Sequence, residues 1–153
     1  MDIATLCILQ YLIPRPRFPP HRQIRRHRWT KTVPRLVLLD ANALLMPFQF
    51  RVNLDREIQR LLGDVDVAVP KPVLTELEFL AERDREARAG LRLARRYRVI
   101  DATGSADDAL LDLAGTNRAV VVTNDQPLLE RLRVKGIPRL FLRSRNHLVA
   151  EGL

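Results

Sequence analysis

Acidic residues follow several short aliphatic runs in this sequence, and carboxylates at such positions are candidates for catalysis or metal binding. Asp40 directly follows "LVLL" at residues 36–39, and Asp125 comes two residues after "RAVVVT" at residues 118–123. A carboxylate at the end of a hydrophobic strand is costly unless it is paired, hydrogen-bonded or bound to a cation. Asp40 is therefore the first candidate for a functional carboxylate.

Two other segments carry acids in comparable places. Glu76 lies early in the segment after "VAVPKP", and Asp107 and Asp108 open the segment after "YRVI". Each acid alone has a structural explanation, such as capping a helix or facing the positive end of a helix dipole. As a group they favour a metal site, because clustered carboxylates raise one another's pKa unless a cation neutralises them. Ligands that are all oxygen favour Mg²⁺ or Mn²⁺ over zinc.

Alternating strands and helices must position these acids. Short aliphatic runs predict strands at residues 36–39, 65–69, 97–100, 118–123 and 138–142. Apolar residues at helical spacing predict helices at Leu54–Leu62, Val73–Arg83, Ala87–Tyr97, Asp107–Ala114 and Pro127–Val134, and "LVLLDANALL" indicates a further helix after Asp40. We therefore expect an α/β fold, a three-layer α/β/α sandwich with a mainly parallel central sheet of about five strands.

The order of these elements predicts where the acids meet. In an open parallel sheet, ligands bind outside the carboxyl ends of the strands, near the point where the strand order reverses. The four acidic positions lie after four different predicted strands, so we expect them to converge at one edge of the sheet.

Composition excludes several other kinds of site. The single cysteine rules out a disulfide framework or a cysteine-rich zinc site. The sequence has only three histidines, so catalysis that depends on histidine is disfavoured. No apolar run approaches the roughly 20 residues of a membrane span, so we expect a cytoplasmic protein with no membrane partner. The six glycines form no phosphate-binding loop motif. A phosphorylated receiver domain is also disfavoured, because its acidic pair would follow the first strand.

The net charge of +8 is concentrated at the N-terminus. Residues 1–35 hold eight Lys or Arg and one acid, together with five of the ten prolines. We interpret residues 1–34 as a basic, Pro- and Arg-rich extension that is disordered, or as an over-long translation start. A phosphate-binding arm is the functional alternative. Residues 35–153 form the predicted domain.

Four segments of the chain resemble the motifs of PIN-domain nucleases. They are "LLDANALL", "VPKPVLTELEFLA", "SADDALLDLA" and "VVTNDQPL". Within that family, "MPFQF" and "LRSRNHL" are similar to an archaeal group related to the small-subunit processome nuclease of ribosomal RNA processing. Toxins of the VapC type share the acidic motifs and are the second match.

This resemblance implies a divalent-metal-dependent endoribonuclease that holds one or two Mg²⁺ or Mn²⁺ ions. By position it assigns metal binding and catalysis to Asp40, Glu76, Asp107 and Asp125. It assigns supporting roles to Asn42 and Thr123. Because a helix turns about 100° per residue, Asp107 and Asp108 cannot both point at one metal. We therefore expect Asp108 to support Asp107.

RNA is the implied substrate, and basic side chains are needed beside an acidic pocket. The candidates are Arg51, Lys71, Arg143, Arg145 and His147, each of which could equally be ordinary surface. The resemblance allows a homodimer, an antitoxin partner or a ribosome-assembly partner. The alternatives to ribosomal RNA processing are a VapC-type toxin ribonuclease and a PIN-type module that binds RNA or protein without cutting.

Overall fold

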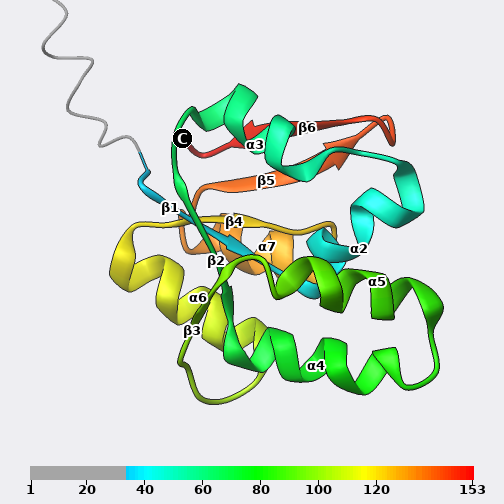
Figure 1. Ribbon diagram of the computed structural model, residues 1–153. Helices are drawn as coiled ribbons and strands as arrows, with labels where there is room; N and C mark the ends of the chain where they lie inside the picture. Colours follow the sequence, from blue (N-terminus) through cyan, green and yellow to red (C-terminus); the bar gives the residue numbers. More distant parts are fainter. Residues whose placement is uncertain (1–33) are drawn as a thin grey trace, which may run out of the picture. The chain divides into compact units, whose positions relative to one another are not determined.

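Strands and helices alternate along residues 34–153, the part of the chain that the structure, a computed structural model, describes (Figure 1). The strands are β1 (Leu36–Leu39), β2 (Asp66–Pro70), β3 (Arg98–Ile100), β4 (Val120–Val122), β5 (Arg139–Arg143) and β6 (His147–Glu151). The helices are α2 (Ala41–Phe50), α3 (Leu54–Leu62), α4 (Lys71–Ala81), α5 (Arg85–Ala94), α6 (Ala106–Asn117) and α7 (Gln126–Val134).

All six of these strands form one sheet in the order β3-β2-β1-β4-β5-β6. The first five are parallel to their neighbours, and β6 is antiparallel to β5. The predicted α/β fold with a mainly parallel sheet is therefore confirmed. The chain builds outward from β1 to β3, then returns to place β4 on the other side of β1. The strand order thus reverses between β1 and β4.

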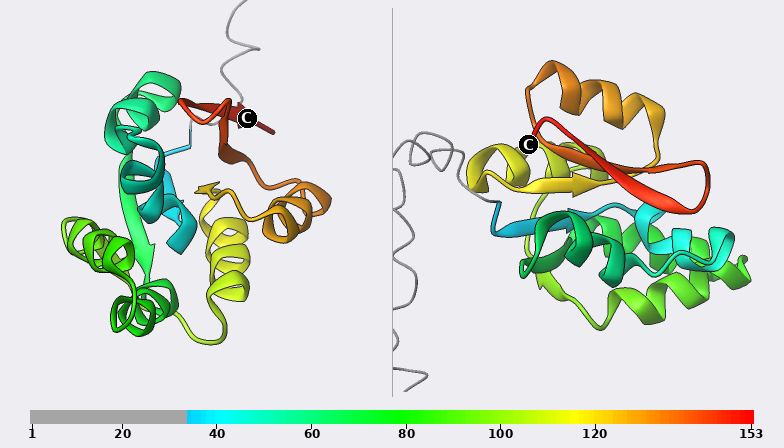
Figure 2. Two further views of the ribbon diagram at one scale, coloured as in Figure 1. Left: turned by 90° about the vertical axis from the view of Figure 1, so that its right-hand side faces the viewer. Right: turned by 90° about the horizontal axis from the view of Figure 1, so that it is seen from above.

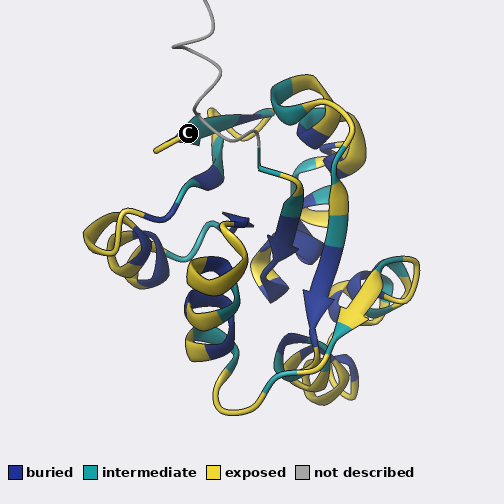
Figure 3. Ribbon diagram, turned by 90° about the vertical axis from the view of Figure 1, so that its left-hand side faces the viewer, coloured by how far each residue is buried: buried dark blue, intermediate teal, exposed yellow. Residues whose placement is uncertain are grey.

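The two strands beside this reversal form the centre of the core. Val37, Leu38 and Leu39 of β1 are fully buried, and so are residues 120–122 of β4 (Figure 3). Continuous aliphatic runs suit strands that are covered on both faces, whereas an alternating pattern would suit a sheet with one face in water. The two strands are in register, with Val37 paired to Val120 and Leu39 paired to Val122.

Helices cover both faces of the sheet, as right-handed crossovers require. The crossovers from β1 to β2 and from β2 to β3 place α2 to α5 on one side (Figure 2). The crossovers from β3 to β4 and from β4 to β5 run in the opposite direction across the sheet, so α6 and α7 lie on the other side. The three layers match the predicted sandwich.

Helix α5 packs very closely on α2. A Cβ atom added at Gly90 would lie 3.1 Å from Leu45 Cδ2 and 3.2 Å from the backbone oxygen of Leu44. The α5 residues on this side are small, with Ala87, Gly90 and Ala94 buried. A helix at Ala87–Tyr97 was predicted, but α5 spans Arg85–Ala94. It begins earlier because the Asp84 side chain caps it by accepting from the Glu86 N–H at 2.8 Å.

Strand β6 was not predicted, and it forms one edge of the sheet. Its hairpin with β5 turns at Ser144 and Arg145, both with left-handed φ angles of 54° and 60°. Glycine or asparagine usually marks such a turn, so the sequence gives no hairpin signal here. The outer edge of β6 is covered: the Leu148 N–H donates to Glu57 Oε2, and Arg60 Nη2 donates to the Leu148 oxygen, both at 2.8 Å. These bonds occupy backbone groups that could otherwise pair with another strand.

The extension predicted at residues 1–34 lies, apart from Pro34, outside the described residues. Within residues 34–153, none of the helices combines the length and apolar character needed to span a bilayer.

Candidate active site

The reversal of strand order brings two acidic residues together. Asp40 directly follows β1, and Asp125 is the third residue after β4, so both lie at the carboxyl ends of neighbouring parallel strands. Such a position is the usual place for a ligand site in an open α/β sheet.

Asp40 is buried, with 4% of its surface exposed, and both of its carboxylate oxygens are hydrogen-bonded. Oδ1 accepts from the Ala41 N–H at 2.8 Å, which makes Asp40 the N-cap of α2. Oδ2 accepts from Thr123 Oγ1 at 2.7 Å. Burial nevertheless raises the pKa of Asp40 above its usual value, and repulsion from Asp107 and Asp125 raises it further, although the two hydrogen bonds oppose the shift.

Thr123 connects the two acidic strand ends. Its hydroxyl donates to Asp40 and accepts the Asp125 N–H at 3.0 Å, and the residue is fully buried. One hydroxyl therefore fixes the Asp40 carboxylate and the backbone of Asp125. The supporting role expected for Thr123 has a physical basis in these two bonds.

Asp125 is the N-cap residue of α7, but its side chain makes no capping hydrogen bond. Helix capping was the structural explanation for this acid in the sequence. Since the carboxylate does not cap α7, that explanation does not account for it. Its charge instead contributes to the raised pKa values of Asp40, Glu76 and Asp107.

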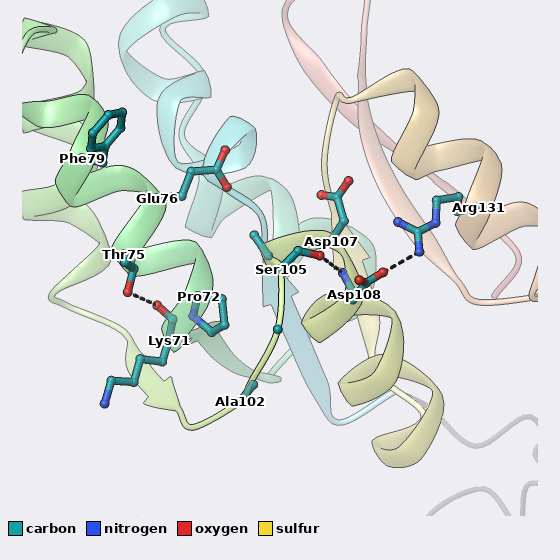
Figure 4. Close-up of a pocket in the computed structure, with 12 residues that line it drawn as sticks. Lys71, Pro72, Thr75, Glu76, Phe79, Ala102, Ser105, Asp107, Asp108 and Arg131 are labelled. Carbon is teal, nitrogen blue, oxygen red and sulfur yellow. Dashed lines mark hydrogen bonds and ion pairs between the residues drawn. The ribbon is translucent and has the colours of Figure 1, made fainter.

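Glu76 and Asp107 come from α4 and α6, and Figure 4 shows their carboxylates turned toward the space between these helices. Partial burial is the main cause that raises the pKa of both groups. Repulsion from Asp40, Asp107 and Asp125 adds to the effect on Glu76. Repulsion from Asp125 adds to the effect on Asp107. The acids from four separate segments thus act on one another electrostatically.

The adjacent acids of α6 point to different partners. Asp108 Oδ1 accepts from Arg131 Nη2 of α7 at 2.7 Å, and this guanidinium is the main reason that the pKa of Asp108 is lowered (Figure 4). The Asp108 N–H donates to Ser105 Oγ at 3.2 Å, which caps α6. Asp107 makes no ion pair within residues 34–153. Arg131 lowers the pKa of Asp107 through space, but burial and the charges of Asp125 and Asp108 outweigh this effect and leave it raised.

The donor chemistry of the cluster fits a hard divalent cation. The four carboxylates supply only oxygen ligands. Repulsion within the group raises the pKa of Asp40, Glu76 and Asp107, and a bound cation would relieve this repulsion. As they stand, no three Asp, Glu, His or Cys side chains within residues 34–153 are grouped tightly enough to hold a metal ion. Binding of an ion would therefore require the carboxylates to move closer together.

The two asparagines near the site have different surroundings. Asn42 was expected to position the carboxylates, but its side chain is exposed and makes no hydrogen bond to Asp40. Asn124, which the sequence reasoning passed over, accepts the Leu142 N–H at 2.9 Å through Oδ1 and so ties the end of β4 to β5. Its place between Thr123 and Asp125 was the only signal for this role.

Four of the five basic candidates lie near the carboxyl edge of the sheet. Lys71 begins α4, and Arg143, Arg145 and His147 belong to the hairpin that extends β5 beyond this edge. Arg51 lies elsewhere, in a separate pocket with Tyr97 and Arg96.

A cavity of about 940 Å³ adjoins the cluster between α4 and the start of α6. Glu76 and Asp107 line it together with Lys71, Thr75, Phe79 and Ser105 (Figure 4). Its size lies within the range of small-molecule sites, and one side is open to solvent, so a segment of a longer chain could enter it.

Comparison with known proteins gives consistent matches over the described domain. A family model for a PIN like domain matches residues 37–145. Ribonuclease VapC4 of Methanocaldococcus jannaschii is 32% identical over 127 residues, which cover 76% of this chain and 97% of that protein. Ribonuclease VapC9 of Archaeoglobus fulgidus is 25% identical over 124 residues, 78% of this chain and 91% of that protein.

Among solved structures, the PIN domain endonuclease Utp24 superimposes with a TM-score of 0.67 at 26% identity. The match covers 77% of this chain and 92% of the Utp24 chain. The similarity therefore extends over nearly the whole of each compared protein, and it includes both groups that the sequence motifs resemble.

Proposed function

The chain belongs to the PIN-like domain family, and on this premise we propose that it is a divalent-metal-dependent endoribonuclease. The observation that carries the proposal is the set of acids at the strand reversal. Asp40, Glu76, Asp107 and Asp125 come from four βα segments, and repulsion among these acids raises the pKa of Asp40, Glu76 and Asp107. Nuclease names among the relatives support the same reading.

In this proposal the four acids hold one or two Mg²⁺ or Mn²⁺ ions. Bound there, an ion supplies Lewis-acid activation of water and neutralises charge on the scissile phosphate. Thr123 holds Asp40 in its ligand orientation and fixes the start of α7 beside it. Asn42 is exposed in the first turn of α2, two residues after Asp40, and its side chain is available to contact the water or the substrate. The products implied by the family resemblance are a 5′-phosphate and a 3′-hydroxyl.

The substrate backbone needs cations, because the acidic cluster alone repels RNA. Lys71 lines the cavity, and Arg143 and Arg145 lie on the hairpin at the same edge of the sheet. We propose that these three side chains bind phosphates on either side of the cut. His147 pairs with Arg143 beside the turn of the hairpin, whereas Arg51 lies in a separate pocket.

We propose two alternative cellular roles, both implied by the motif resemblance. One is ribosomal RNA processing with a ribosome-assembly partner, and the other is a VapC-type toxin with an antitoxin. The similarity to the PIN domain endonuclease Utp24 and to Ribonuclease VapC4 supports a nuclease in either role. Both roles act on cytoplasmic RNA. A neighbouring gene for a small antitoxin would favour the toxin role, whereas specific cutting of a ribosomal RNA precursor would favour processing.

The test is cleavage of a structured RNA by the purified full chain in Mn²⁺. Asp40→Asn should reduce the rate by about 100-fold or more, since loss of a direct ligand should cost at least as much as loss of an outer-shell partner. A chelator should abolish cleavage by the wild-type protein. Cleavage that persists in the variant at the wild-type rate would contradict the proposal. A folded wild-type protein that binds RNA without ever cutting it would support the non-cleaving module.

A further inference from the structure

Phe79 is a large apolar side chain left in solvent beside the acidic cluster. Its side chain is 69% exposed, although aromatic residues make up only 5% of the sequence. It lines the cavity that also contains Glu76 and Asp107. Neither the core nor the proposed metal chemistry accounts for it.

The position of Phe79 on α4 places it on the substrate side of the helix. It follows Glu76 by three residues, which brings two side chains onto one helical face. The same face carries Lys71 and Thr75, and all four residues line the cavity. Figure 4 shows Phe79 next to Glu76 along α4, on the side of Glu76 away from Lys71.

The ring contributes little to the fold. The buried residues of α4 are Val73, Leu77 and Ala81, which lie on another face of the helix. Replacement of Phe79 by a small polar residue should therefore leave the domain folded.

The surroundings of Phe79 do not suit the interface of a second copy. Its exposed apolar neighbour is Leu80, at 39%, and the acids Glu78 and Glu82 flank the pair. A stable protein interface buries about 800 Å² on each partner around a hydrophobic centre. Two side chains between acids do not provide such a centre.

The other walls of the cavity suit a nucleotide. Lys71 makes no ion pair in the described part of the chain, so its ammonium is available to a phosphate. Arg131, the other cation of the lining, is already paired with Asp108. The open cavity therefore combines an aromatic face, an available cation and two carboxylates of the proposed metal site, Glu76 and Asp107.

We propose that Phe79 stacks on an unpaired RNA base next to the phosphate held at the acidic cluster. The proposal rests on the proposed function, since it assigns the RNA path at that site. Stacking requires a base whose face is accessible, and a paired base inside a duplex does not offer one. Phe79 thereby selects RNA in which the nucleotide beside the cut is single-stranded.

The test measures binding, with Asp40→Asn as the parent so that the RNA stays intact. The probe is a short single-stranded RNA carrying 2-aminopurine, whose fluorescence falls when it stacks on an aromatic ring. The same RNA annealed to its complement is the duplex probe. Phe79→Ser, Phe79→Tyr and Val134→Ser are each introduced separately into this Asp40→Asn parent. Val134 is the matched control because it is 73% exposed at the far end of α7.

Phe79→Ser should weaken binding of the single-stranded probe by about tenfold, the value of one base–aromatic stack, and should abolish the quenching. Phe79→Tyr should restore both. Val134→Ser should match the parent, and binding of the duplex should be equal in all variants. A Phe79→Ser protein that binds and quenches like the parent would overturn the proposal. The stacking proposal would also be overturned if the parent did not bind single-stranded RNA, or if Phe79→Ser changed the oligomeric state.

These outcomes separate the two proposals. The proposed function fails if Asp40→Asn cleaves RNA at the wild-type rate, whether or not the Phe79 variants change RNA binding. The stacking proposal fails if Phe79→Ser binds single-stranded RNA normally, even when cleavage depends on Asp40.

Discussion

A single buried hydroxyl organises the centre of the site. Thr123 Oγ1 donates to Asp40 and accepts from the Asp125 N–H, so two strands that are distant in sequence share one hydrogen-bonded junction. Every buried polar side-chain atom within residues 34–153 has a hydrogen-bond partner. The charge on Asp40 is nevertheless unfavourable without a cation, because burial and neighbouring acids both raise its pKa.

This raised pKa predicts how stability depends on pH. The folded protein holds the Asp40 proton more tightly than the unfolded chain does, so this contribution to stability is present at acidic pH. It is lost as the pH rises through the pKa of the folded state. Relative to Asp40→Asn, the metal-free wild-type protein should therefore become less stable between acidic and neutral pH. Thermal unfolding of both proteins across that range measures the difference.

Mn²⁺ provides the control for this pH effect. At neutral pH it should raise the melting temperature of the wild-type protein much more than that of Asp40→Asn, because a ligand that binds only the folded state stabilises it. A stability difference that stays constant with pH, or that increases in favour of the wild type, would show that burial of Asp40 carries no such penalty.

Single residues were predictable from the sequence where chain position alone decides their role. Helical geometry predicts only that Asp107 and Asp108 cannot both point at one metal, and the resemblance to the family motif assigns the metal to Asp107. In the structure Asp108 pairs with Arg131. The contribution of Asn124 could not be predicted, since its partner Leu142 lies on another strand. Asn42 lies beside Asp40 in sequence, yet its side chain turns to solvent.

At the scale of elements, the close packing of α5 on α2 depends on Gly90. Gly90→Val should destabilise the protein by about 1–3 kcal/mol, because even its Cβ would lie 3.1 Å from Leu45 Cδ2 and 3.2 Å from the Leu44 oxygen. The matched change is Gly115→Ala in α6, where nothing lies within 4 Å of the added Cβ. It should stabilise the helix by about 0.5–1 kcal/mol.

Denaturant unfolding of the two glycine variants measures both effects. If Gly90→Val were as stable as the wild-type protein, α5 would not be packed on α2 as described. If Gly115→Ala were destabilising, the surface of α6 at that position would be covered by something other than solvent.

Elements with a strong pattern were predictable, and those defined by distant contacts were not. The five aliphatic runs became β1 to β5. The reason is clearest for β1 and β4, because a strand buried on both faces needs little besides apolar side chains. Strand β6 escaped prediction since its turn uses Ser144 and Arg145 in a conformation that favours glycine. The packing of α5 on α2 brings together Gly90 and Leu45, which are about 45 residues apart, and helical spacing alone does not reveal this contact.

At the scale of the whole molecule, the strand order explains why scattered acids form one cluster. Parallel strands with right-handed crossovers place all their carboxyl ends at one edge, and the reversal between β1 and β4 brings Asp40 beside Asp125. The sequence could predict the shared edge from the alternation of elements. It could not predict the distances between the acids, which depend on how α4 and α6 pack across the cavity.

The central claim is that these acids form one divalent-metal site for cutting RNA, and the adjacent acids of α6 offer the most direct measurement. Cleavage rates of one structured RNA are compared for Asp107→Asn and Asp108→Asn across a Mn²⁺ titration. Asp107→Asn should lose about 100-fold or more in rate and need more Mn²⁺. Asp108→Asn should stay within about tenfold of the wild type, because Asp108 pairs with Arg131. Equal losses in both variants, or a larger loss in Asp108→Asn, would contradict the account.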